Sequence, residues 1–169
     1  MQIREENTED WAAVRELIGA AFGQVQEADL VEKLRQNCKE RLSLVAVSGS
    51  RVVGQILFTP VMISGAKGSL QGMGLAPVAV APECQRQGVG SLLIKNGIAR
   101  LADTGCPFIV VLGHPEYYPR FGFEPTKLHG IRSEWEVPEE AFMIMVLNPF
   151  AMKDVEGVAK YHPEFAQAL

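Results

Sequence analysis

The sequence predicts an α/β fold with a mixed central sheet and helices on both faces. Two stretches near the N-terminus carry apolar residues at helical spacing, and strand-like apolar runs recur between residues 42 and 80. A strand, a helix and a second strand then follow one another from residue 75 to residue 112. Helical patterns that alternate with strand patterns are typical of α/β proteins. The chain of 169 residues suits one domain with a sizeable core.

The N-terminal part is predicted to form a short strand over residues 2–4 and then two helices. Thr8 is expected to cap the first helix, because a hydroxyl there can accept a bond from a free backbone N–H. Apolar side chains recur at helical spacing up to Phe22, and Gly23 is expected to end that helix. The second helix is predicted over residues 27–36. Core packing explains the apolar stripes of both helices.

The middle and late parts are predicted to supply the sheet. Residues 42–47 and 51–63 form a hairpin, and a fourth strand follows a turn at residues 65–68. A helix over residues 88–103 then leads to a buried strand over residues 108–112, an arrangement that indicates a parallel strand pair. A late strand is predicted over residues 142–147. The stretch from residue 125 to residue 140 is expected to be irregular.

The composition excludes several function classes. The net charge is −4 with no run of Lys or Arg, so no nucleic acid is expected as a partner. No apolar run approaches the roughly 20 residues that cross a bilayer, and the N-terminus does not resemble a signal peptide. Three scattered cysteines indicate a cytoplasmic protein without disulfides. No metal site is expected, because His129 and His162 lack acidic or cysteine partners at useful spacing.

A glycine-rich turn between the fourth strand and the following helix is the strongest functional signal. It contains Gln85, Gly88 and Gly90, and the helix begins directly after it. The N–H groups at a helix start have no acceptor inside the helix and lie at the positive end of its dipole. Such an end attracts phosphate, and glycine allows a phosphate to approach the backbone closely.

Two common phosphate-binding motifs do not fit this turn. The Walker A string G-x-x-x-x-G-K-[ST] is absent, and the third glycine of a dinucleotide motif is replaced by Leu93. No acidic residue follows the strand over residues 108–112 to hold a ribose. The remaining pattern is Q-x-x-G-x-G from Gln85 to Gly90, preceded by Val80-x-Pro82.

These residues resemble the acetyl-CoA signature [RQ]-x-x-G-x-[GA] of the GCN5-related N-acetyltransferase (GNAT) superfamily. About thirty residues later, Tyr118-Pro119-Arg120-Phe121-Gly122-Phe123 matches the family pattern Y-x-[KR]-x-G-F. The string that begins at Gly113 resembles a bacterial branch of small acetyltransferases. The resemblance implies the GNAT-type fold, in which strands 4 and 5 splay apart. It further implies an acetyltransferase domain over residues 1–147 and a C-terminal tail, residues 148–169, packed on the same domain.

The resemblance implies that the protein moves an acetyl group from acetyl-CoA directly to an amine. Tyr118 takes the position of the family's general acid. Backbone groups freed by the splay would bind pantetheine, and the turn would bind the diphosphate with a further contact from Arg86. The implied cofactor-binding residues are Val78, Ala79, Val80, Gln85, Arg86, Gln87, Gly88, Val89, Gly90, Ser91 and Tyr118.

Several alternatives stay open at this point. Pro77 marks either a bulge that splays strand four or a plain sheet edge. No general base is identified, and Glu116, His114 or a water relay could serve. The acidic residues between 134 and 140 indicate either a solvated loop or a rim that attracts a cationic amine. The rival functions are a non-catalytic acyl-CoA sensor that uses the same pocket and a nucleotide-binding protein. A homodimer through the late strands or the tail is also open.

Overall fold

The computed structural model describes residues 1–167 and contains two compact units. Unit 1 comprises Met1–Phe58, Ala76–Ala99 and the C-terminal residues from Pro163. Unit 2 comprises Thr59–Leu75 and Arg100–His162. Strands β3 (Arg51–Gly65) and β4 (Gly68–Val80) run through both units. The sheet has the strand order β1-β2-β3-β4-β5-β8-β6, with β9 paired to both β3 and β7.

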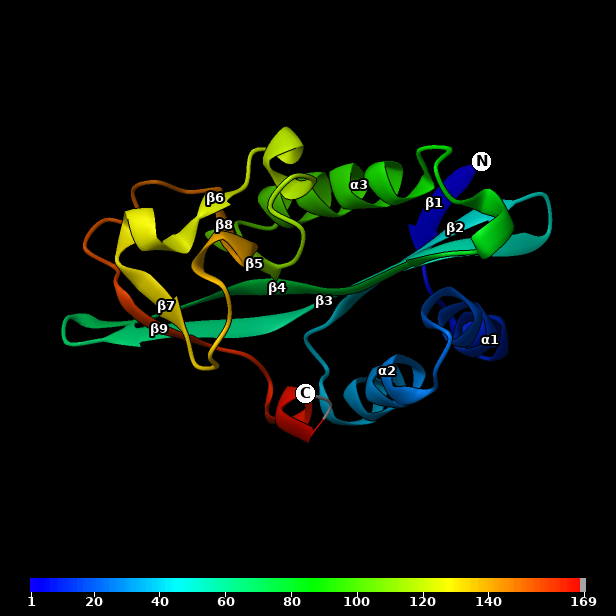
Figure 1. Cartoon of the computed structure of the whole chain (residues 1–169), viewed down its shortest axis with the longest axis horizontal. Helices are drawn as coiled ribbons and strands as arrows, with labels where there is room; N and C mark the ends of the chain where they lie inside the picture. The colour runs from blue at the N-terminus through cyan, green and yellow to red at the C-terminus, as the bar shows by residue number, and fades with distance from the viewer. Residues whose placement is uncertain (168–169) are drawn as a thin grey trace. The chain divides into compact units, whose positions relative to one another are not determined.

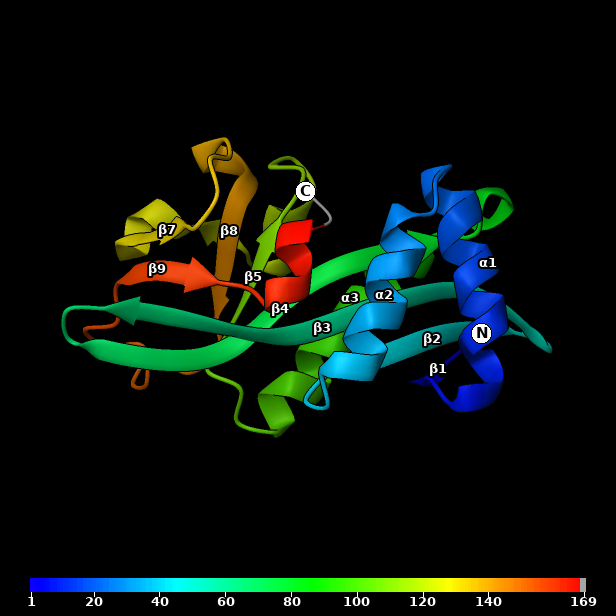
Figure 2. The same cartoon turned by 90° about the horizontal axis from the view of Figure 1, so that it is seen from below.

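Unit 1 places helices on both faces of its strands, as the sequence predicts. Strand β2 (Leu42–Ser48) pairs antiparallel with β1 (Gln2–Glu5) on one side and with β3 on the other. Helices α1 (Trp11–Phe22) and α2 (Gln26–Asn37) cover one face of β2 and β3, whereas α3 (Val89–Asp103) lies on the other face (Figures 1 and 2). The middle of the α1 stripe and the α2 stripe are buried core faces, as predicted, whereas Trp11 and Phe22 at the two ends of α1 are each 41% exposed.

The predicted N-cap of the first helical segment is wrong by one residue. Asn7 rather than Thr8 is the cap, and its side-chain oxygen accepts a hydrogen bond from the Glu9 N–H at 3.0 Å. The Asp10 carboxylate in turn accepts from the Asn7 N–H at 2.8 Å, which completes a capping box. Gly23 ends α1 in the left-handed conformation, as predicted.

Glycines line the contact between helix α3 and strand β3. A Cβ atom added to Gly54 would lie 2.9 Å from both Leu93 Cδ1 and Val89 Cγ1. A Cβ atom added to Gly97 would overlap the ring of Phe58, which is fully buried. The close contact fixes where α3 begins, and therefore where the glycine-rich turn is held.

Replacing Gly97 with Ala is expected to destabilise the protein by about 2 kcal/mol, because overpacking a tight core outweighs the gain in helix propensity. Gly19→Ala is the matched control, since Gly19 is also helical but has open space where a Cβ would lie. That variant is expected to gain about 0.5–1 kcal/mol. Urea unfolding measures both. A Gly97→Ala protein as stable as Gly19→Ala would show that α3 and β3 are not in close contact.

Unit 2 contains the parallel pair that the sequence predicts. Strand β5 (Phe108–Leu112) pairs in parallel with β4 through Met73, Gly74 and Leu75. Strand β8 (Phe142–Val146) pairs antiparallel with β5 over its whole length. The two-residue strand β6 (Glu124–Pro125) pairs with the other edge of β8.

The expectation of an irregular stretch over residues 125–140 is wrong in part. It contains the 3₁₀ helix η4 (Thr126–His129) and strand β7 (Ile131–Ser133), and the 3₁₀ helix η5 (Glu139–Ala141) begins at its end. Strand β9 (Gly157–Lys160), which the sequence did not predict, pairs in parallel with β7 and antiparallel with β3. Strands this short carry little periodicity, so their pairing partners determine them.

The last described residues of the C-terminal segment form a short helix. The 3₁₀ helix η6 (Pro163–Gln167) lies beside α2 in Figure 2, and Asn37 Nδ2 donates to Glu164 Oε1 at 3.0 Å. Phe165 is buried, as expected of a tail that packs back. Residues 168 and 169 of the predicted tail lie outside the described residues. The division into a domain over residues 1–147 and a tail stays a prediction.

Candidate functional site

The glycine-rich turn of unit 1 has the conformation of a loop that presents its backbone. Arg86 and Gly88 both adopt left-handed backbone conformations, with φ of 62° and 88°. The side chains from Gln85 to Gln87 are exposed, whereas Val89 is buried and anchors the start of α3. Glycine adopts a positive φ without steric cost, so Gly88 suits its position. Arg86 adopts the same region at a cost of about 1–2 kcal/mol.

Side-chain and backbone contacts hold this turn in place. The Gln85 amide nitrogen donates to the Val80 carbonyl at 3.1 Å, and the Gln87 amide nitrogen donates to the Glu83 carbonyl at 3.3 Å. The Glu83 carboxylate pairs with Arg51, and the Ala81 N–H donates to the Val53 carbonyl at 2.9 Å. Gln85 therefore contributes by shaping the turn, because its amide nitrogen is already engaged.

The start of α3 offers free main-chain donors. The bond from the Leu92 N–H to the Gly88 carbonyl, 3.0 Å long, belongs to the first helical turn. The N–H groups of residues 88–90 come before it and have no acceptor inside the helix. They lie at the positive end of the α3 dipole, where a phosphate is favoured. The turn also follows Val78, Ala79 and Val80 directly in the chain, so unit 1 brings these predicted residues into one segment.

The register of β4 and β5 bears on the predicted splay. Their parallel pairing joins Met73 to Ile109, Gly74 to Val110 and Leu75 to Val111. The peptide bond between Ala76 and Pro77 is cis, and it follows directly after the last of these pairs. Proline has no N–H to donate to a ladder, in keeping with a change of pairing at this point. The splay of the two strands beyond Leu75 stays a prediction.

Tyr118 lies in unit 2, at the start of the 3₁₀ helix η3 (Tyr118–Phe121). Its ring contacts Phe123 edge-on at 5.7 Å between centroids, and a Cβ atom added to Gly113 would overlap it. Burial, with a smaller contribution from the charge of Tyr117, raises the pKa of Tyr118 to about 12. The phenol is therefore a neutral proton donor at every physiological pH.

Tyr161 is a second buried phenol of unit 2. Its ring fills the space above Gly74, where an added Cβ would lie 2.7 Å from Cε2 of the ring. Burial raises the pKa of Tyr161 above its usual value, with smaller contributions from the charges of Glu134 and Tyr118. A glycine in the middle of β4 is the signal that could have indicated the contact of Tyr161 with Gly74.

The candidate bases His114 and Glu116 are both exposed, in the bend that leads to Tyr118. The expectation that His129 lacks an acidic partner is wrong, because its Nε2 lies 2.6 Å from Glu124 Oε1. Among residues 1–167, no group of three or more potential metal ligands occurs. Within the same residues, no helix is long and apolar enough to cross a membrane.

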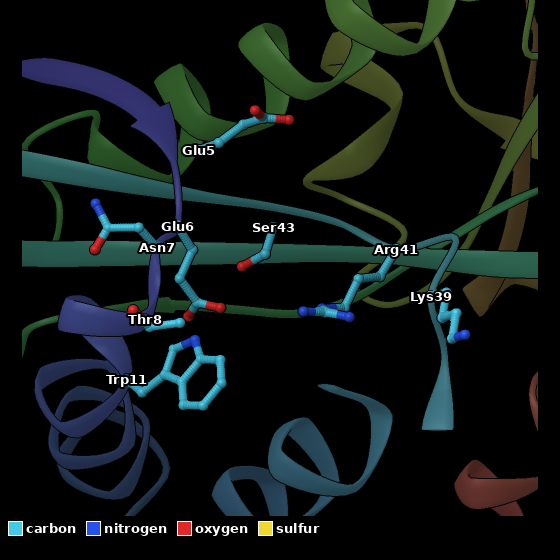
Figure 3. A pocket seen from close by; sticks show the side chains of 8 residues that line it. All are labelled: Glu5, Glu6, Asn7, Thr8, Trp11, Lys39, Arg41 and Ser43. Carbon is cyan, nitrogen blue, oxygen red and sulfur yellow. The ribbon is translucent and has the colours of Figure 1, made fainter. Parts of the chain in front are cut away.

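A cavity of about 420 Å³ in unit 1 is a second candidate site (Figure 3). The side chains of Glu6 and Arg41 point toward its centre, whereas Glu5 points away. The Glu6 carboxylate is buried and pairs with Arg35 at 3.0 Å, and the Arg35 guanidinium lies 4.7 Å from the Trp11 ring. Arg41 donates to the backbone carbonyls of Arg35 and Cys38. These contacts join helix α2 and the loop after it to the segment of Glu6 and Trp11, so the charged groups that point toward the centre of the cavity already have partners within the protein.

Proteins similar to this chain are acetyltransferases of the GNAT family. The acetyltransferase (GNAT) domain family matches residues 2–126. The chain is 36% identical to YhbS of Escherichia coli, an uncharacterised N-acetyltransferase, over 98% of both chains. The crystal structure of YhbS in complex with CoA superposes with a TM-score of 0.90 at 34% identity, covering 98% of this chain and 91% of that one.

A GNAT acetyltransferase from Brucella melitensis, in complex with acetyl-CoA, is also similar. Its structure gives a TM-score of 0.79 at 33% identity, and the match covers 97% of each chain. The match to the family domain takes in β4, the glycine-rich turn, α3 and the segment of Tyr118. The mixed sheet with its parallel pair of β4 and β5 is the fold of these neighbours. The chain belongs to the GNAT family of acetyltransferases.

Proposed function

We propose that the chain transfers the acetyl group of acetyl-CoA directly to an amine, without a covalent enzyme intermediate. The observation that carries this proposal is the exposed turn at the start of α3, whose main-chain donors suit a diphosphate. The similarity to structures that contain CoA and acetyl-CoA supports acetyl-CoA as the cosubstrate. The proposed contacts are backbone groups of Val78–Val80 for pantetheine and residues 85–91 for the diphosphate.

Transfer requires one bond to form and one to break. The amine nitrogen attacks the thioester carbonyl carbon, a nitrogen–carbon bond forms, and the carbon–sulfur bond breaks. A main-chain N–H in the Val78–Val80 segment would stabilise the carbonyl oxygen as it becomes negative. Tyr118 would donate to the leaving thiolate, since its phenol carries its proton at physiological pH. The proton that the amine loses would pass to solvent or to a base such as Glu116 or His114.

Acetyl-CoA is expected to stabilise the fold against heat, whereas NAD and ATP are not. A ligand at one hundred times its Kd adds about 2.7 kcal/mol of stability, which raises Tm by about 5–10 °C in a chain of this size. A thermal-shift titration with the three ligands measures this. Equal shifts with ATP or NAD would favour the nucleotide-binding alternative.

Release of free CoA thiol, measured over a panel of amines, tests the transfer itself. The panel should include small amines, amino acids, a peptide N-terminus and a lysine peptide. Release that depends on both acetyl-CoA and one class of amine is the expected result. Binding of acetyl-CoA without release for any amine would favour the alternative of a non-catalytic acyl-CoA sensor.

A further inference from the structure

A cavity of about 330 Å³ opens in unit 2 between η4, β7 and the start of β8. Four apolar side chains line it: Ile131, Trp135, Val137 and Phe142. Ile131 and Phe142 are buried, whereas Trp135 and Val137 are half-buried at the opening. The cavity therefore offers an aromatic and branched apolar wall to a small molecule.

The charges around this cavity balance one another. Its lining contains the cations Lys127 and Arg132 and the anions Glu136 and Glu139. Lys127 and Glu139 pair across 3.6 Å, while Arg132 and Glu136 are exposed and make no ion pair with any residue from 1 to 167. The cations offset the acidic residues of the loop, so the rim does not select a cationic arm. The apolar wall is then the feature of the cavity that selects among ligands.

Trp135 is held firmly as one wall of the cavity. Its ring lies 5.2 Å from the ring of Tyr161, and its backbone N–H donates to Ser133 Oγ at 3.0 Å. The neighbouring Glu134 carboxylate accepts a bond from the Tyr161 N–H at 2.7 Å. These contacts tie the loop to the segment that follows β9. A wall fixed before a ligand arrives costs little ordering entropy on binding.

Thr126 adds a polar group to the cavity. The residue is only 3% exposed and lines the cavity. A threonine hydroxyl can both donate and accept a hydrogen bond, so a ligand with a polar atom near its apolar part suits this wall.

One wall of the cavity belongs to β8, which pairs with β5, the strand that leads to Tyr118. Phe142, in this wall, pairs with Leu112 at the end of β5, and the Gly113 N–H donates to the Ala141 carbonyl at 2.9 Å. Gly113 is the residue against which the ring of Tyr118 packs. The paired strands β5 and β8 of unit 2 therefore connect the cavity wall to the residue against which the proposed acid packs.

We infer that this cavity holds the apolar arm of the acceptor, so that the preferred acceptors are amines with an aromatic or branched apolar arm. Trp135 is then the residue that determines this specificity. The inference rests on the proposed acetyl transfer and names its substrate class. The arm would fill the space between Trp135 and Phe142, and its amine would stay outside the cavity for acetylation.

Binding is tested by fluorescence, without any need for turnover. The chain has two tryptophans, so Trp135 is the sole one in a Trp11→Phe variant. The probe is 2-phenylethylamine, with ethanolamine as the polar comparison. The expected result is a saturable change in Trp135 emission with 2-phenylethylamine and none with ethanolamine. No saturable change with either amine would overturn the inference.

Kinetics then test the role in specificity. Trp135→Ala is expected to lower kcat/KM for 2-phenylethylamine at least about tenfold while that for ethanolamine and the KM for acetyl-CoA stay unchanged. Trp135→Phe is expected to restore most of the preference. Leu128→Ala is the control, because Leu128 is 66% exposed, lies in η4 and does not line the cavity.

The outcomes separate the two proposals. Transfer to ethanolamine that equals transfer to 2-phenylethylamine, or an equal loss for both in Trp135→Ala, would overturn the specificity inference and leave the proposed function standing. An emission change with no acetyl transfer to any amine would overturn the proposed function, and the acceptor role of the cavity with it.

Discussion

Tyr118→Phe is expected to lower kcat by about 10²–10⁴-fold while the Kd for acetyl-CoA stays unchanged, because the variant removes only the proton donor. The ring is kept, so its contacts with Phe123 and the space above Gly113 are preserved. Steady-state thiol release measures kcat, and calorimetric titration measures the Kd. Turnover at the parent rate in this variant would exclude Tyr118 as the acid.

Tyr117→Phe is the matched control for this prediction. Tyr117 is the neighbouring phenol, its ring lies 5.2 Å from that of Tyr118, and it is less deeply buried. Loss of its hydroxyl is expected to leave kcat largely intact. An equal loss in both variants would indicate that the two rings act through packing rather than through one proton donor.

The pH dependence gives a separate check on Tyr118. Burial raises its pKa to about 12, so the phenol keeps its proton well above pH 10, where an ordinary tyrosine is half ionised. The contribution of this group to kcat is therefore expected to persist from pH 8 to about pH 10.5. The same raised pKa means that the folded state loses stability from this group only as the pH rises from about 10 towards 12. A limb in kcat near pH 10 that Tyr118→Phe abolishes would show that this phenol ionises near its ordinary value, which would contradict the raised pKa.

Gly88→Ala is expected to raise the Kd for acetyl-CoA about tenfold or more, which is at least about 1.4 kcal/mol of binding free energy. Two effects add here. The left-handed backbone of Gly88, with φ of 88°, disfavours any residue with a Cβ, and a methyl group would obstruct the approach of a phosphate. Titration calorimetry with acetyl-CoA measures the change.

Gly105→Ala separates backbone strain from loss of the phosphate site. Gly105 also has a positive φ, 83°, with open space around its added Cβ, but it follows the C-terminal end of α3. Both variants are expected to lose about 1–2 kcal/mol of folding stability. Only Gly88→Ala should weaken binding. Equal and unchanged affinities in both would show that the turn does not hold the cofactor.

The elements that the sequence predicted correctly are those with long, regular patterns. The run from β4 through the glycine-rich turn to α3 and β5 is an example, because a buried strand, a turn rich in glycine and an amphipathic helix each have a distinct periodicity. The position of Gly23 at the end of α1 followed equally from backbone conformation alone. Local residue properties determine such features, so no knowledge of the rest of the fold was needed.

The features that the sequence did not predict depend on contacts between distant segments. Strand β9 has four residues and is defined by its pairing with β3 and β7. The contact of Tyr161 with Gly74 joins residues far apart in the chain, and no local pattern marks it. Asn7 and Thr8 are both acceptable caps, and the reciprocal bond from Asn7 to Asp10 decides between them.

The same distinction applies to the candidate site. The motif residues from Gln85 to Gly90 and the segment of Tyr118 could be found from their spacing. The cavity beside Trp135 could not, because β7, η4 and β8 form its walls together. The sequence left the acidic loop open as a rim for a cationic amine, and the fold adds Lys127 and Arg132, which offset its charge.

A crystal structure of the protein with bound acetyl-CoA is the most direct measurement of the central claim, namely that main-chain donors at the start of α3 bind the diphosphate. The expected result is diphosphate oxygens about 2.7–3.2 Å from the nitrogens of residues 88–90. A diphosphate bound elsewhere, with this turn making no contact to the cofactor, would contradict the account.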